Sequence, residues 1–175
     1  MLKYKPMGKL KIRKYPDKIL SKKSAVVRNI GDKERQLASD MIEAMREFDG
    51  IGLAAPQVGV LKRVIVVEDA TGNNKGVPYI FFNPRIIKQK GRCGFCEGCL
   101  SVSGVTSDVI RPESVVMEAL GPDGKEIKIE TGGILARILQ HEIDHLDGIL
   151  FIDRVNFFKR KKILKQISTK VCMEL

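Results

Sequence analysis

The fold is decided by residues 131–146, TGGILARILQHEIDHL, which predict a helix built around two histidines. Thr131 is a suitable cap for the start of this helix, and Gly148 follows its end. His141 and His145 stand four residues apart, so both imidazoles lie on one helical face and can reach one metal ion. The 175 residues contain 2 histidines in total, so a chance pairing at this spacing is a poor explanation. We therefore predict a metal-binding helix.

The helix also offers a base and an apolar wall beside the expected metal. Glu142 lies between the histidines on a neighbouring side, close enough to handle a water molecule at the metal without being a ligand. Ile138 and Ile134 continue the histidine face toward the start of the helix. We expect this wall to accept an aliphatic side chain of a substrate, although ordinary core packing explains the two isoleucines equally well.

A catalytic metal needs a third protein ligand, and the sequence offers two places for it. Asp153 lies downstream of the helix but follows it quickly. Cys99 lies upstream, beside Gly98, and a thiolate at the end of a short strand is a good soft ligand. We favour Cys99 and keep Asp153 as the alternative.

Cys93, Cys96 and Cys99 are spaced like the first three ligands of a ferredoxin-type cluster, but the fourth cysteine is missing and Cys172 is far away. We therefore interpret Cys93 and Cys96 as free thiols that are open to oxidation. Clustered cysteines also argue against a disulfide framework.

The remaining elements predict an α+β fold in which the strands are clustered. Residues 32–48 follow the spacing of an amphipathic helix capped by Asp32. Its apolar face is Leu37, Met41, Ala44, Met45 and Phe48. Strands are expected at 63–68, 79–88, 99–102, 114–120 and 126–130, and a last helix at about 156–169. Because Pro84 lies within the second strand, we expect part of that strand to be at an edge or a bulge. We expect a hairpin turn at residues 121–124.

Positive charge is concentrated at the two ends of the chain. The net charge is +10, and residues 1–23 and 154–175 hold nine and seven basic residues with one acid each. Such ends attract polyanions, nucleic acid above all, whereas solvated lysine faces are the plainer interpretation. Because the start has lysines and no apolar core of a signal peptide, we expect a bacterial-type cytoplasmic protein, with an organelle as the alternative.

Three segments, Gly50–Gln57, Glu97–Ser101 and Gln140–His145, resemble in order and spacing the three signature motifs of the peptide deformylase family. The resemblance extends from Lys11 to Asp153. It implies antiparallel sheets around a central metal-binding helix, with an N-terminal and a C-terminal helix. It also implies a metal-dependent amide hydrolase that removes formate from the N-terminal formylmethionine of newly made polypeptides.

The resemblance assigns roles to individual residues. One divalent metal would be bound, Fe²⁺ first and Zn²⁺, Ni²⁺ or Co²⁺ as alternatives. The implied metal ligands are Cys99, His141 and His145, and the implied acid and base is Glu142. Gln57 and the Leu100 N–H would stabilise the oxyanion. Ile51 and Gly52 would pair with the substrate backbone, and Ile134 and Ile138 would contact the methionine side chain. Ser103 stands where the family usually has proline.

We expect one domain over 1–175 and a monomer, in which residues 1–8 are an extension and 154–175 a basic helix that docks on ribosomal RNA. Two other functions compete. The His-Glu-x-x-His pattern alone also fits a zinc endopeptidase, and the basic ends alone fit an RNA-binding module.

Overall fold

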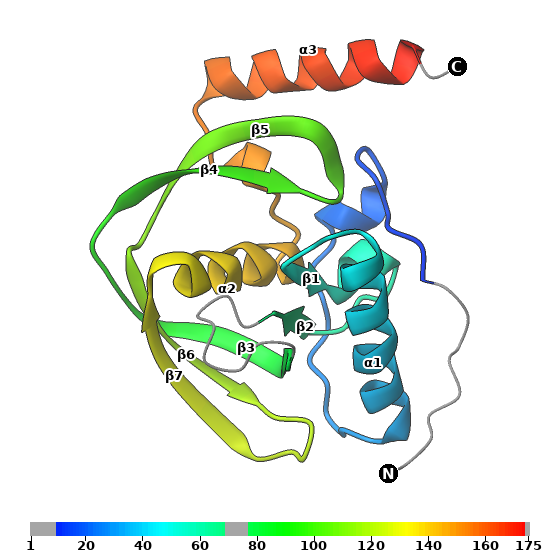
Figure 1. Ribbon diagram of the computed structural model, residues 1–175, viewed down its shortest axis with the longest axis vertical. Coiled ribbons are helices and arrows are strands. Elements are labelled where there is room, and N and C mark those ends of the chain that lie inside the picture. The colour runs from blue at the N-terminus through cyan, green and yellow to red at the C-terminus, as the bar shows by residue number, and fades with distance from the viewer. Residues whose placement is uncertain (1–9, 69–76, 174–175) are drawn as a thin grey trace.

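The structure, a computed structural model, describes residues 10–68 and 77–173 (Figure 1). A central helix, α2 (Gly133–Leu146), lies between a five-stranded antiparallel sheet and a two-stranded hairpin. The sheet has the order β1-β2-β3-β6-β7, with β1 Gly52–Ala54, β2 Val64–Val67, β3 Tyr79–Lys90, β6 Ser114–Leu120 and β7 Glu126–Gly132. The hairpin pairs β4 Cys93–Cys99 with β5 Val102–Arg111. The predicted α+β class is confirmed.

Helix α1 (Asp32–Glu47) packs its apolar face against β1 and β2. Leu37, Met41, Ala44 and Met45 are buried as predicted, whereas Phe48 is 42% exposed because it lies just beyond the last helical turn. The cap is Gly31 and not Asp32: the Gly31 N–H donates to Glu34 Oε2 at 3.1 Å. The glutamate three positions into a helix supplies this bond from its side chain.

Strand β3 contains the predicted bulge but is not an edge strand. It pairs with β2 on one side and β6 on the other, and its register shifts between Phe82 and Arg85. Asn83, in the bulge, has φ 52° and exchanges two hydrogen bonds of 2.8 Å with the backbone of Val27. The bulge is what allows Pro84, which lacks an N–H, inside a central strand.

The expected strand at 99–102 is wrong, because these residues form the tight turn between β4 and β5. Cys99 ends one strand and pairs with Val102, which begins the next. Along β4 most side chains are exposed, so the strand has no alternating apolar pattern by which the sequence could reveal it.

Helix α2 begins later than predicted. Thr131 belongs to β7, and Gly132 stands at the cap position. The helix ends at Leu146, and Gly148 follows the Asp147 cap with a φ of 73°; a Cβ added to Gly148 would lie 2.7 Å from the Ser21 carbonyl. Eleven of the fourteen residues are buried, since sheets cover two sides of the helix.

The remaining elements follow the sequence closely. The β6–β7 hairpin turns at 121–124 as predicted. Short 3₁₀ helices are η1 Lys18–Ser21, η2 Ala55–Val58 and η3 Phe151–Asp153. The last helix, α3 (Phe157–Met173), packs Ile163 and Ile167 on the valines of β5. Among the described residues, no helix combines the length and the apolar character that a bilayer span requires. The expected extension over 1–8 and the Cys172 side chain lie outside what the structure describes.

Candidate metal centre

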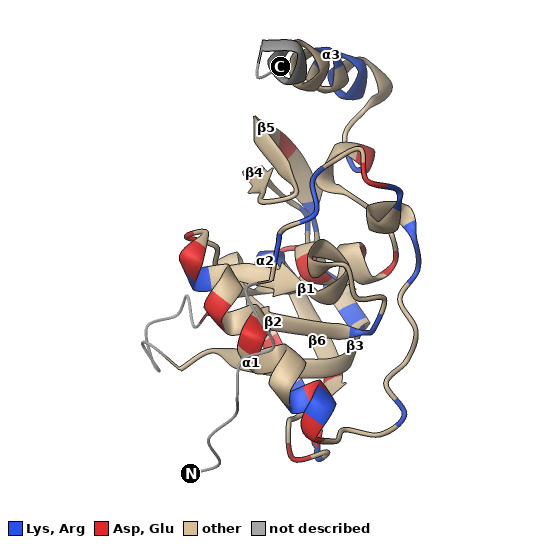
Figure 2. Cartoon of the chain, turned by 90° about the vertical axis from the view of Figure 1, so that its right-hand side faces the viewer, with Lys and Arg blue, Asp and Glu red and all other residues tan. Residues whose placement is uncertain are grey.

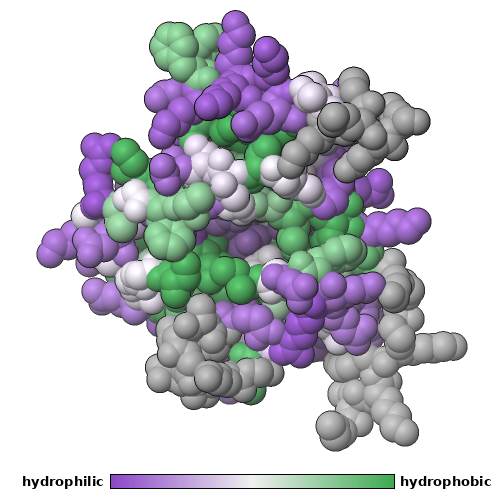
Figure 3. All heavy atoms as spheres, turned by 45° about the horizontal axis from the view of Figure 1, so that its top comes forward, coloured by the Kyte–Doolittle hydropathy of each residue, from purple (hydrophilic) through white to green (hydrophobic). Residues whose placement is uncertain are grey.

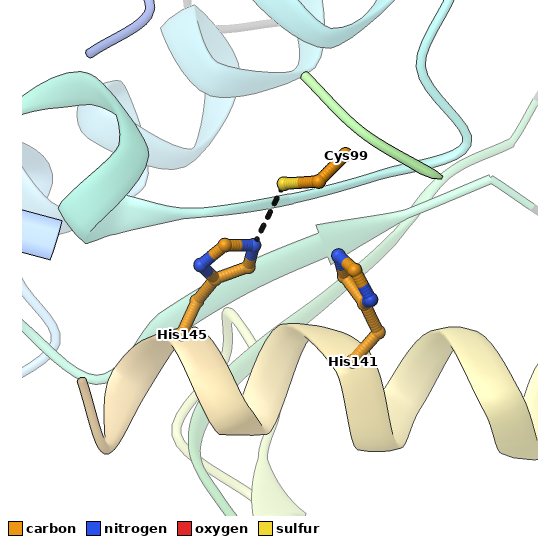
Figure 4. A group of neighbouring side chains, drawn as sticks. All are labelled: Cys99, His141 and His145. Carbon is orange, nitrogen blue, oxygen red and sulfur yellow. Dashed lines mark hydrogen bonds between the residues drawn. The ribbon is translucent and has the colours of Figure 1, made fainter. Parts of the chain in front are cut away.

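Three side chains from two distant parts of the sequence converge above helix α2 (Figure 4). Cys99 comes from the end of β4, and His141 and His145 from α2, with their ligand atoms all within 4.8 Å of one another. Cys99 Sγ lies 3.2 Å from His145 Nε2. One sulfur and two imidazole nitrogens suit zinc, iron, nickel or cobalt, and the set leaves positions open for water and substrate.

Glu97 orients the first histidine. Its Oε2 lies 3.0 Å from His141 Nδ1, so the Nδ1–H donates to the carboxylate, and in the neutral ring that binds a metal the free lone pair is on Nε2. Burial alone would raise the pKa of Glu97, but hydrogen bonds from His141 and Arg111 outweigh it and lower the pKa to about 2. The carboxylate therefore stays ionised and holds the ring in one tautomer.

Three arginines neutralise the buried acids behind the centre. Arg111 donates to both oxygens of Glu97, at 2.7 and 3.0 Å, and to Asp144 at 2.7 Å. Arg137 donates to Glu97 Oε1 at 2.5 Å and to the Cys93 carbonyl at 2.7 Å. Arg154 binds Asp144 from the other side. The network joins β4, β5, α2 and the segment after η3 into one rigid support.

The charge state of Cys99 favours metal binding. Burial alone would raise the pKa of this thiol, but His145 and His141 outweigh it and lower the pKa well below its usual range. The thiolate is the form that binds a metal. The buried His145 Nδ1 has no hydrogen-bond partner among the described residues, whereas its Nε2 faces Cys99 Sγ. The donor set thus fits a divalent ion.

Glu142 lies beside the centre without joining it. Its side chain is buried, and Oε2 has no hydrogen-bond partner among the described residues. Burial raises the pKa of this carboxyl, as expected for a group that takes up and releases a proton. Gly52 makes room for it: a Cβ on Gly52 would lie 2.6 Å from Glu142 Oε1.

Gln57 presents its amide nitrogen to the same place. Its Oε1 accepts the Ala54 N–H at 2.8 Å, which fixes the orientation of the amide. Its Nε2 then faces Cys99 Sγ at 3.6 Å and Ser101 Oγ at 3.3 Å. Leu100 lies in the turn after Cys99, and Lys14 Nζ donates to its carbonyl at 2.6 Å. Gln57, Cys99 and Leu100 all line this part of the site.

A cavity of about 580 Å³ opens above these groups between β1 and β4. Both are edge strands, and the pocket lining includes Ile51 and Gly52 from one side and residues 95–99 from the other. Ile134 and Ile138 line it from α2, together with Phe95, whose ring lies 5.5 Å from the Arg137 guanidinium carbon. Figure 3 shows this face, with hydrophobic residues gathered around a hydrophilic hollow. Open strand edges beside an apolar lining are typical of sites that bind a chain by strand addition.

The alternative ligands lie elsewhere. Asp153 accepts hydrogen bonds from the Leu150 N–H at 3.0 Å and from Arg160 at 3.2 Å. Within residues 10–68 and 77–173, no cluster of potential ligands other than Cys99, His141 and His145 is found, so Cys93 and Cys96 join no cluster there. Both are exposed free thiols.

Sequence reasoning missed Arg111 and Arg137, which support the centre. The signal was available for Arg137. It stands four residues before His141 on the same face of an otherwise apolar helical turn, and a buried guanidinium in such a place needs acidic partners. No comparable pattern surrounds Arg111, which lies at the end of β5.

Comparison with known proteins places these observations in context. The sequence profile described as polypeptide deformylase matches residues 9–161. A peptide deformylase of Thermodesulfovibrio yellowstonii is 47% identical over 164 residues, covering 94% of this chain and 99% of that protein. A second, from Halothermothrix orenii, is 49% identical over 149 residues and covers 85% and 95%.

Solved structures agree. The crystal structure of a peptide deformylase from Legionella pneumophila superposes with a TM-score of 0.86 at 38% identity, covering 94% of this chain and 96% of that one. The Ehrlichia chaffeensis peptide deformylase in complex with actinonin gives 0.85 at 39% identity, with 94% and 98% covered.

Proposed function

The chain belongs to the polypeptide deformylase family, and from this premise we propose how its own residues carry out the reaction. The enzyme is a metal-dependent hydrolase that removes the formyl group from the N-terminal formylmethionine of new polypeptides and releases formate. The convergence of one thiolate and two imidazoles beneath a cavity between two edge strands is the observation that carries the proposal.

We propose that Cys99, His141 and His145 hold one divalent ion. When bound, the ion supplies Lewis acidity, which makes water nucleophilic near neutral pH. Glu142 accepts a proton from the attacking water on its carboxylate and delivers that proton to the nitrogen of the leaving methionine. The C–N bond of the formamide breaks, formate leaves with the new oxygen, and a free amine remains.

The oxyanion and the substrate backbone have separate partners. Gln57 Nε2 and the Leu100 N–H donate to the oxyanion, each interaction being worth about 3 kcal/mol in such sites. Ile51 and Gly52 pair with the substrate backbone at the open edge of β1, while Ile134 and Ile138 contact the methionine side chain. Because Gly52 borders Glu142, pairing there holds the formamide next to the base.

We further propose Fe²⁺ as the metal in the cell, with Zn²⁺, Ni²⁺ and Co²⁺ as functional substitutes. A thiolate with two imidazoles tolerates all four ions. Anaerobic purification followed by elemental analysis identifies the ion. Air should inactivate the iron form through oxidation of the metal and of Cys99, and nickel or cobalt should slow that loss. Equal decay of all forms would instead implicate the exposed Cys93 or Cys96.

Turnover of a formyl-Met tripeptide, with metal content measured on the same sample, tests the proposal. The wild type should release formate in proportion to bound metal. Cys99→Ser should lose metal and turnover together, because a hydroxyl is a poor substitute for a thiolate. Cleavage of unformylated casein without formate release would establish the endopeptidase alternative.

The partner of the enzyme is the nascent chain, and we propose that α3 docks the enzyme on ribosomal RNA. The described part of this helix has basic residues and no acid (Figure 2). Lys159 and Lys161 are exposed, whereas Arg160 pairs with Asp153. Replacing Lys159 and Lys161 with glutamine should weaken ribosome binding at low salt, since phosphate contacts depend steeply on salt. Unchanged binding would leave α3 as a solvated lysine face.

A further inference from the structure

A second hollow of about 770 Å³ lies between β5 and α3, outside the metal centre. One wall is the start of β5, with Gly104, Val105 and Thr106. The other wall is a single stripe of α3: Lys162, Lys165, Gln166 and Thr169. We call this hollow the α3 groove, and none of the described residues that line it is acidic.

The direction of the two lysines is fixed by packing. Ile163 and Ile167 are buried among the valines of β5, so the helix cannot rotate about its axis without exposing them. Lys162 and Lys165 therefore remain beside β5. Among the described residues, neither ammonium lies within 4.0 Å of a carboxylate, in contrast to Arg160, which pairs with Asp153 at 3.2 Å. Two uncompensated positive charges thus face the groove.

The α3 groove shares a border with the metal-site cavity. Gly104, Val105 and Thr106 line both hollows, so one short segment of β5 is their common border. Figure 3 shows hydrophilic side chains gathered at the top of the same face that holds the central hollow. A chain that lies between β1 and β4 and continues past this border enters the α3 groove.

We propose that the α3 groove binds the downstream part of the substrate polypeptide and prefers chains with Asp or Glu a few residues after formylmethionine. The proposal rests on the deformylase function described above and adds a selectivity to it. Charge complementarity favours an acidic chain, and the shared border favours a ligand that is covalently continuous with the reacting end. A detached polyanion such as RNA needs the charges but not the continuity.

Synthetic formyl-Met peptides of eight residues test the proposal in the absence of ribosomes. Two adjacent aspartates are moved along positions 3 to 8, with Asn and Lys versions as controls, and kcat/KM is measured at low salt. We expect the best Asp peptide to exceed its Asn counterpart by about threefold to tenfold, through KM, since two exposed ion pairs are worth no more than this. The Lys version should be the poorest, and 0.5 M salt should remove the difference.

Matched variants locate the effect. K162Q/K165Q should abolish the preference for Asp over Asn, whereas K159Q/K161Q removes the same charge from the same helix outside the groove and should retain it. Each value is divided by turnover of a formyl-Met tripeptide, which lacks every residue beyond position 3. Loss of tripeptide turnover in the wild type would refute the deformylase assignment, not the groove.

Three results would overturn the proposal. The first is equal kcat/KM for Asp, Asn and Lys peptides at every position. The second is a preference that survives K162Q/K165Q or that K159Q/K161Q removes equally. The third is a short RNA that binds the wild type and not K162Q/K165Q while peptide selectivity is absent, which would make the groove a nucleic-acid site.

Discussion

Glu142 has a role that depends on being close to the metal centre and yet free of it. It is buried, its Oε2 has no partner among the described residues, and its pKa is raised by burial. Glu142→Gln keeps the shape and removes the proton acceptor, so we predict a loss of turnover of at least about 100-fold. Metal content should stay near one ion per chain. Elemental analysis beside a formate-release assay checks both, and loss of the ion would show that Glu142 is itself a ligand.

Gly52 should be nearly as sensitive, for a steric reason. A Cβ at this position would lie 2.6 Å from Glu142 Oε1 and 2.9 Å from Ile138 Cγ2, so Gly52→Ala must displace the base or the pocket wall. We predict a fall of about 10-fold or more in kcat, with metal retained. Gly94→Ala is the control, because nothing lies within 4 Å of its Cβ. Equal kinetics for the two variants would contradict the proposed closeness of Gly52 to the base.

The residues of the centre were the most predictable part of the molecule. Helical periodicity alone places His141 and His145 on one face, and the scarcity of histidine makes the pair informative. Helical periodicity cannot join Cys99 to them, because that contact spans 46 residues and depends on how the hairpin folds over α2. For Cys99, chemical preference and family resemblance supplied what local pattern could not.

Among the elements, the end of α2 shows how a single glycine positions the catalytic helix. Gly148 has a positive φ, and its added Cβ would meet the Ser21 carbonyl at 2.7 Å. We predict that Gly148→Ala lowers the free energy of unfolding by about 2–4 kcal/mol, combining strain with a backbone clash. Gly124→Ala shares the positive φ but meets nothing within 4 Å, and should cost only about 1 kcal/mol. Urea unfolding measures both, and equal losses would mean that the clash is relieved cheaply.

The elements themselves were predicted unevenly, and the reason is exposure. Helix α1 and strand β6 of the β6–β7 hairpin each bury one face, so apolar residues recur in their sequences at a regular spacing. Strand β4 has little buried surface apart from Glu97, so its sequence has no hydrophobic period, and the sequence predicts a strand where the turn after β4 lies. The sequence predicts Thr131 as a helix cap because a threonine side chain suits that role, but pairing with Val115 keeps Thr131 in β7.

At the scale of the whole molecule, we expect the bound metal to stabilise the fold. Its three ligands join β4 to α2, two elements that the buried network of Glu97, Arg111 and Asp144 also holds together. An ion that binds only the folded chain at about 100 times its Kd adds about 2.7 kcal/mol. We predict that Ni²⁺ or Zn²⁺ added to the metal-free protein raises Tm by about 5–10 °C. Calorimetry checks this, and Cys99→Ser should show a clearly smaller shift; an equal shift would place the ion elsewhere.

The position of the cavity between two strand edges also bears on when the reaction can occur during the life of a substrate chain. We expect a chain end to enter as extended backbone, because its N–H and C=O groups are then available to the open edges of β1 and β4. In a chain end that is already part of a helix or a sheet, those N–H and C=O groups are hydrogen-bonded within the substrate. We therefore expect deformylation to compete with the folding of its own substrate. A protein whose first residues fold early should retain its formyl group.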